Sequence, residues 1–122
     1  MNNAVGWFEI YVQDMDRAKA FYERMLQVQL SRIDSPDIDM WAFTMAPDAP
    51  GAAGALVRMP GFQSGGNSVL VYFNCADCAD EAARAILAGG KLQQEKMSIG
   101  QYGNIALVID TEGNMIGLHS MQ

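Results

Sequence analysis

The chain has 122 residues, a length typical of a single domain with one hydrophobic core. Half of its residues are hydrophobic and its mean hydropathy is +0.01, which excludes wholesale disorder. The net charge of −6 disfavours binding to nucleic acid, and no apolar run approaches the roughly 20 residues needed to span a membrane. Only two cysteines and no export-signal pattern at the N-terminus favour a cytoplasmic protein.

The sequence predicts the same order of elements twice. An aromatic and β-branched strand over 5–12 leads to Asp14, a predicted helix N-cap, and a strand over 68–75 leads to Asp77, the predicted cap of a second helix. The apolar sides of the two helices are expected to be Met15, Ala18, Phe21, Tyr22, Met25 and Leu26 in the first, and Ala82, Ala83, Ile86 and Leu87 in the second.

Strand-like segments follow each helix, with a turn signal over 110–114 before the last one. They cover 28–33, 40–45 and 55–59 in the first half, and 91–96, 105–110 and 115–121 in the second. We therefore expect an α+β chain that forms one domain over 1–122. Its two βαβββ modules, about 4–60 and 67–121, are joined by a Pro/Gly-rich linker.

Alternation along the strands predicts one face against each helix and one facing a cavity. In the first strand Phe8, Ile10 and Val12 should face the helix, and in the second Val69, Val71, Phe73 and Cys75 should do so. The opposite faces predict a mostly apolar cavity with a few polar groups. Its candidate ligand-binding residues are Trp7, Glu9, Tyr11, Arg58, Leu70, Tyr72, Asn74, Gly117 and His119.

Glu9 is the candidate catalytic residue, because burial beside Trp7 would raise its pKa toward the range of a general acid or base. A second interpretation is structural, in which Glu9 pairs with Arg58 or His119 and ties the sheets together.

Two stretches resemble a known family. Residues 8–14 with 18–22, and residues 110–118, resemble the vicinal oxygen chelate superfamily of glyoxalase I, bleomycin-resistance proteins and extradiol dioxygenases. Residues 72–77 and the later Gly89-Gly90 resemble the opening of its second module. The resemblance implies that eight strands curl into a half-open barrel with a helix outside each half, usually within a homodimer.

The resemblance also indicates where a divalent metal would be held. The positions that carry metal ligands in that superfamily are occupied here by Trp7, Leu70 and Gly117, none of which is a ligand type. We therefore expect no metal and no other cofactor, although Glu9 and His119 could form a divergent metal site.

Three hypotheses for function remain. The favoured one is a binding protein that holds an apolar or aromatic small molecule without a metal. The second is a lyase, isomerase or dioxygenase that uses a divergent metal site or Glu9 as acid and base. The third is a redox module built on the Cys75-Ala76-Asp77-Cys78 motif, since a thiolate near a helix N-terminus can have a lowered pKa.

Overall fold

A computed structural model describes residues 3–122 and contains the predicted βαβββ order twice. In chain order the elements are β1 (Trp7–Tyr11), α1 (Met15–Leu26), β2 (Ser31–Ile33), β3 (Asp39–Ala42), β4 (Ala53–Arg58), β5 (Tyr72–Asn74), α2 (Cys78–Leu87), β6 (Lys91–Ser98), a 3-10 turn (Gly100–Tyr102), β7 (Asn104–Ile109) and β8 (Met115–Ser120). We call the part up to β4 module 1 and the part from β5 module 2.

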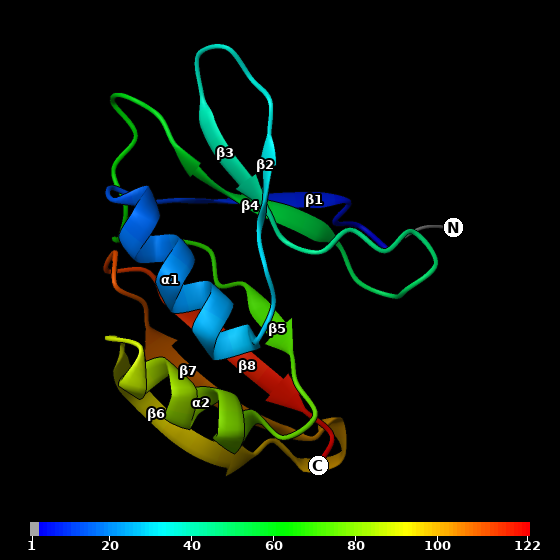
Figure 1. Cartoon of the computed structure of the whole chain (residues 1–122). Helices are drawn as coiled ribbons and strands as arrows, with labels where there is room; N and C mark the ends of the chain where they lie inside the picture. The colour runs from blue at the N-terminus through cyan, green and yellow to red at the C-terminus, as the bar shows by residue number, and fades with distance from the viewer. Residues whose placement is uncertain (1–2) are drawn as a thin grey trace.

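Each module forms a four-stranded sheet with the same topology. The strand orders are β1-β4-β3-β2 and β5-β8-β7-β6, so the first strand of each module lies at an edge and runs parallel to the last strand. Figure 1 shows α1 and α2 next to each other, with α2 over the second sheet. The two-module α+β fold is confirmed, and the curling of its strands into a half-open barrel stays a prediction.

Both predicted helix caps are confirmed. The Asp14 carboxylate accepts a hydrogen bond of 3.1 Å from the Arg17 backbone N–H, and Asp77 accepts one of 3.1 Å from Ala79. These bonds satisfy amide groups of the first helical turn that have no partner within the helix. The caps therefore define where both helices begin.

The two modules share one core. Phe8 and Phe43 of module 1 pack against Phe73 of module 2, with ring centroids 6.1 and 5.5 Å from that of Phe73. Tyr22 of α1 lies against the same cluster and is fully buried. The predicted helix-facing side of β1 is thereby confirmed, and so is the inward orientation of Phe73.

The strand predicted over 68–75 is shorter than expected. Only Tyr72–Asn74 forms β5, and Val69, predicted to face the helix, is 71% exposed. The register of β5 against β8 would bring a longer strand alongside Met115. There the Asn67 side chain instead accepts from the Met115 N–H at 3.0 Å and donates to its carbonyl at 2.7 Å. A side chain thus replaces the backbone ladder.

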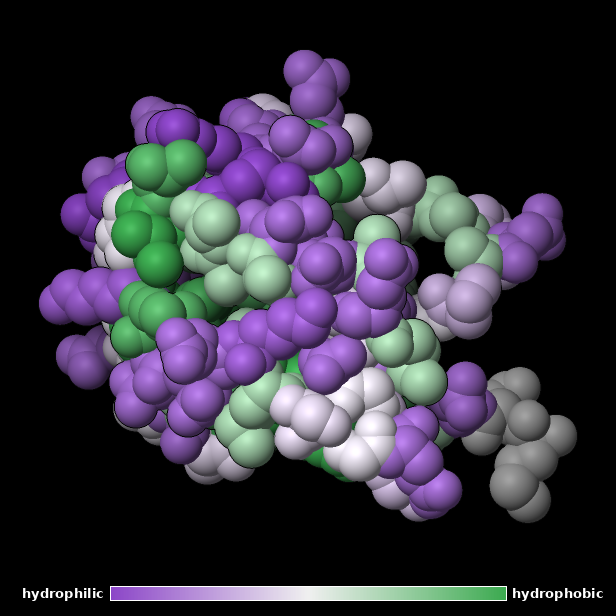
Figure 2. All heavy atoms as spheres, turned by 90° about the horizontal axis from the view of Figure 1, so that it is seen from below, coloured by the Kyte–Doolittle hydropathy of each residue, from purple (hydrophilic) through white to green (hydrophobic). Residues whose placement is uncertain are grey.

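The predicted apolar side of α2 is largely wrong. Its buried residues are Cys78, Ala82 and Ala85, whereas Ile86 is 46% and Leu87 is 68% exposed. Small side chains allow α2 to approach its neighbours closely, and the larger ones are left outside. Figure 2, the view from below, shows a group of hydrophobic residues toward the left of a mainly hydrophilic face.

Candidate functional site

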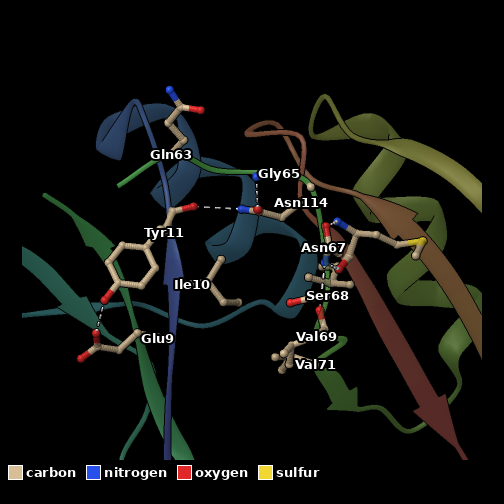
Figure 3. A pocket seen from close by; sticks show the side chains of 13 residues that line it. Glu9, Ile10, Tyr11, Gln63, Gly65, Asn67, Ser68, Val69, Val71 and Asn114 are labelled. Carbon is tan, nitrogen blue, oxygen red and sulfur yellow. Dashed lines mark hydrogen bonds between the residues drawn. The ribbon is translucent and has the colours of Figure 1, made fainter. Parts of the chain in front are cut away.

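The outward face of β1 carries the three predicted residues, held by their own hydrogen bonds. The Glu9 carboxylate accepts from the Tyr11 hydroxyl at 2.8 Å and from Trp7 Nε1 at 3.2 Å. Figure 3 shows the Tyr11 hydroxyl turned toward Glu9. The hydrogen bond to Glu9 and partial burial raise the pKa of Tyr11. Glu9 itself is exposed, so the burial expected for it is not observed.

Glu9 and Tyr11 line a small cavity of about 220 Å³ between β1 and the chain that leads to β5. Asn114 fixes one side of this cavity. Its side chain donates a hydrogen bond of 3.0 Å to the Tyr11 carbonyl and accepts one of 2.6 Å from the Gly65 N–H (Figure 3). This cavity is narrow for an organic ligand, because ligand pockets usually enclose about 300 Å³ or more.

His119 lies on the open face of the second sheet. Together with Tyr72, Asn74, Ile99 and Ile105 it lines a cavity of about 420 Å³. Its Nε2 atom is 2.6 Å from the carbonyl oxygen of Tyr102, in the turn between β6 and β7. Glu9 and His119 therefore line different cavities, which separates the two residues of the predicted divergent metal site.

A third cavity, about 690 Å³, lies where the edge strands β1 and β5 face each other. We call it the inter-sheet cavity. Four of the predicted ligand-binding residues line it, namely Trp7, Leu70, Tyr72 and Asn74. Most of its other walls are apolar side chains from both modules, including Phe8, Leu26, Val28, Phe43 and Phe73. Its size and composition are those of a site for a small organic molecule.

Arg58 does not join this site. It shares the face of β4 on which Leu56 lies, and its Nε donates 3.0 Å to the Gln13 carbonyl near the start of α1. In the pairing with β1, the residues opposite Glu9 and Tyr11 are Ala55 and Val57. Arg58 is on the alternate side of that strand, so the predicted pairing of Glu9 with Arg58 is wrong.

Gly117 allows the Tyr72 ring to lie against β8, on the face of the second sheet that carries His119. It pairs with Tyr72 across β8 and β5, and a Cβ atom at 117 would overlap the Tyr72 ring. The aromatic ring thus occupies the space that a metal-binding glutamate at this position would need. Trp7 and Leu70, the other two positions indicated by the resemblance, offer no donor atom for a metal.

The donor set present does not fit a divalent metal at these positions. Among residues 3–122, no three His, Cys, Asp or Glu side chains gather closely enough to hold an ion.

Glu81 is a lining residue of the inter-sheet cavity that sequence reasoning missed. Its side chain is only 12% exposed, and its carboxylate lies 3.7 Å from the Arg84 guanidinium. Its place follows from helical spacing once the buried residues of α2 are known, since Glu81 follows the buried Cys78 by three residues and precedes the buried Ala85 by four. The sequence predicts a different apolar side for this helix, so the spacing gave no usable signal.

The two cysteines do not have the properties of a redox pair. Cys78 is fully buried. Burial, with a further contribution from the Glu81 carboxylate, raises the pKa of the Cys75 thiol to about 12. The thiolate is the reactive form, and it is scarce near neutral pH when the pKa is so high. The structure therefore argues against the redox hypothesis.

Comparison with known proteins gives one family match. The family model described as the Glyoxalase/Bleomycin resistance protein/Dioxygenase superfamily matches residues 4–118. No match was found among curated proteins. No helix among residues 3–122 is long and apolar enough to cross a membrane.

Solved structures with the same fold are distant in sequence. A hypothetical protein from S. aureus has 16% identity and a TM-score of 0.71, with coverage of 98% of this chain and 95% of that chain. A glyoxalase/bleomycin resistance protein/dioxygenase family enzyme from Burkholderia phytofirmans PsJN has 16% identity and a TM-score of 0.70, with coverage of 96% and 98%. Glyoxalase I from Zea mays has 21% identity and a TM-score of 0.75 over 94% of this chain, which spans only 45% of the maize chain.

Proposed function

Because this chain belongs to the glyoxalase/bleomycin resistance protein/dioxygenase superfamily, we propose that it binds a small apolar or aromatic molecule between its sheets without a divalent metal. The observation that carries the proposal is the inter-sheet cavity of about 690 Å³. Apolar walls supply the driving force for binding, and the few polar groups orient the ligand.

The shape of the site favours a flat ligand. Trp7 and Tyr72 both border the cavity and are 40% and 46% exposed, so their rings are available for contact. Aromatic rings gain additional energy from stacked or edge-to-face contacts with a second ring system. Glu9, Tyr11 and His119 line the two adjoining cavities and would contact the parts of a larger ligand that extend beyond the main cavity.

Titration with naphthylmethanol, followed by tryptophan fluorescence, tests this proposal. The chain has two tryptophans: Trp7 borders the cavity, whereas Trp41 lies under the Lys19 ammonium, which is 3.4 Å from its ring centroid. We expect saturable quenching that persists in Trp41→Phe and disappears in Trp7→Phe. Protein treated with EDTA should bind equally well.

Two results would contradict the proposal. The first is the absence of saturable binding in the wild-type protein. The second is binding that appears only when a divalent metal is added back, which would instead favour the metal-dependent lyase, isomerase or dioxygenase.

The proposal includes a cytoplasmic homodimer. It is supported by the acidic composition with only two cysteines and by the usual assembly of the superfamily that the sequence resembles. Light scattering coupled to size exclusion should give twice the chain mass of 13.3 kDa. A monomer at micromolar concentration would contradict the dimer and leave the binding site to be tested separately.

A further inference from the structure

We infer that Glu81 is the group that recognises charge in the inter-sheet cavity, so that the ligand carries an ammonium or amidinium group on its apolar body. The inference rests on the proposed binding function and specifies the class of ligand. It begins from one carboxylate among the apolar residues that line this cavity.

Glu81 lies on α2 and is one of the residues that line the cavity. Its side chain is 12% exposed, and Leu26, Val28 and Phe73 line the same space. Transfer of a charged carboxylate into such surroundings is costly unless a partner compensates it. Arg84, which does not line the cavity, compensates this charge in part from 3.7 Å, and a cationic group of a ligand would add a second partner from within the cavity.

Two neighbours contact the Glu81 carboxylate and leave it acceptor capacity. The Cys75 thiol is one of them. The Arg84 guanidinium is the other, at 3.7 Å, which is too far for a good hydrogen bond. Arg84 also uses its Nε to donate 3.0 Å to the Met25 carbonyl, and this contact holds the guanidinium toward α1. An ionised carboxylate can accept about four hydrogen bonds, so a ligand N–H group has free lone pairs to contact.

Glu9, the acidic residue first singled out, is less suited to this role. It is exposed, and both of its oxygen atoms already accept hydrogen bonds, from Trp7 and Tyr11. It does not line the inter-sheet cavity. An ion pair at an exposed carboxylate is also weaker than one in a partly buried site, because water screens it.

Two probes that differ only in charge test the inference. Naphthylmethylamine is a cation at neutral pH, and naphthylmethanol has the same ring system without the charge. In the wild-type protein we expect the amine to bind about tenfold more tightly or better, as for a charge-assisted hydrogen bond. In Glu81→Gln the two dissociation constants should become nearly equal, with the alcohol still bound.

Glu95→Gln is the matched control, because Glu95 is exposed on β6 and lines no part of the inter-sheet cavity. This variant should keep the preference for the amine. Circular dichroism and thermal melting establish that each variant folds. If Glu81→Gln does not fold, Glu81→Asp serves instead, because it keeps the charge on a shorter side chain. Its preference for the amine should be weaker than that of the wild type but still present.

The outcomes separate this inference from the proposed function. Equal binding of both probes by the wild type would overturn the role of Glu81 and leave the binding function intact. The same holds if Glu81→Gln keeps the full preference, or if Glu9→Gln abolishes it. If neither probe binds to the wild-type protein, both the binding function and the role of Glu81 are overturned.

Discussion

The two modules share one topology but use the connection before their last strand in different ways. In module 2 this connection is the turn 110–114, whose Glu112 carboxylate accepts from the backbone N–H groups of Gln13 at 2.8 Å and Asp14 at 2.9 Å. Arg17 adds a contact of 2.7 Å to the same carboxylate. In module 1 the corresponding loop covers 43–52, and among the described residues its segment 46–51 has one hydrogen bond, internal to the loop, from Ala49 to Ala46.

The difference assigns separate tasks to the two connections. The turn of module 2 ties the second sheet to the start of α1, so it fixes the modules relative to each other. The loop of module 1 borders the inter-sheet cavity through Thr44, Pro50, Gly51 and Ala52. A connection with few fixed contacts can adjust to a ligand, whereas a connection with many cannot. The turn of module 2 thus contributes to stability, whereas the loop of module 1 borders the site.

Removal of the Glu112 carboxylate should have the largest effect on stability, because this carboxylate joins the two modules. Its side chain is fully buried, and Glu112→Ala leaves two backbone N–H groups and Arg17 without their acceptor. We expect a loss of about 3 kcal/mol in the free energy of unfolding, measured with urea. Glu95→Ala, at an exposed carboxylate, should change it by about 0.5 kcal/mol or less. A loss below about 1 kcal/mol for Glu112→Ala would mean that the turn does not hold the modules together.

The same contact predicts acid sensitivity. Burial alone would raise the pKa of Glu112, but hydrogen bonds from Arg17, Asp14, Gln13 and Thr111 lower it to about 2, below its ordinary value of 4.5. A carboxyl with a lowered pKa in the folded state stabilises the protein above its unfolded pKa, and this stability is lost as the pH falls from about 4.5 toward 2. Glu112→Gln should show a smaller loss of stability across that window. An unchanged slope would show that other groups control acid unfolding.

Tyr22→Phe should produce the next largest effect. The buried Tyr22 hydroxyl donates a hydrogen bond of 2.6 Å to Asp110, which joins α1 to the same turn. Burial raises the pKa of Asp110, and the hydrogen bond from Tyr22 opposes that rise. Loss of this hydrogen bond should lower the free energy of unfolding by about 2 kcal/mol, measured by thermal or urea denaturation. Tyr102→Phe, at a 66% exposed ring, is the control and should be nearly neutral.

The last comparison uses two glycines in equivalent strands. A Cβ at Gly54 would overlap the Phe8 ring in the core, and a Cβ at Gly117 would overlap the Tyr72 ring at the surface. Gly54→Ala should cost about 1–3 kcal/mol, as overpacking of a core does. Tyr72 is 46% exposed and can move, so Gly117→Ala should cost less but change the affinity for naphthylmethanol. Equal losses of stability with unchanged affinity would remove Gly117 and Tyr72 from the site.

Features that depend on neighbours along the chain were predicted well. The caps at Asp14 and Asp77 and the inward side of β1 follow from local hydrogen bonding and from alternation. Features that depend on distant partners were not. Val69 is exposed because the Asn67 side chain forms the hydrogen bonds to the Met115 backbone that a longer strand would have formed. Met115 is far along the chain, so the pattern over 68–75 does not predict this contact.

The candidate site divides in the same way. Trp7, Leu70, Tyr72 and Asn74 line the inter-sheet cavity as predicted, but so do Phe8, Val69, Val71 and Phe73, which alternation assigned to the opposite faces. Arg58 was misplaced because its side of β4 depends on the strand register, and alternation on β1 alone does not give that register. Glu81 was overlooked because a charged residue in a short helix is usually solvated.

The sequence by itself therefore determined the two βαβββ modules, their caps and the residue types at the positions where this superfamily holds a metal. These are set by local periodicity, by hydrogen bonding within a few residues and by the chemistry of side chains. Only the tertiary structure decided that Tyr72 covers Gly117, that Glu112 joins the modules and that Glu81 reaches the cavity. Each of these depends on which surfaces meet when two similar modules bury a common core, and packing of that kind is a property of the whole chain.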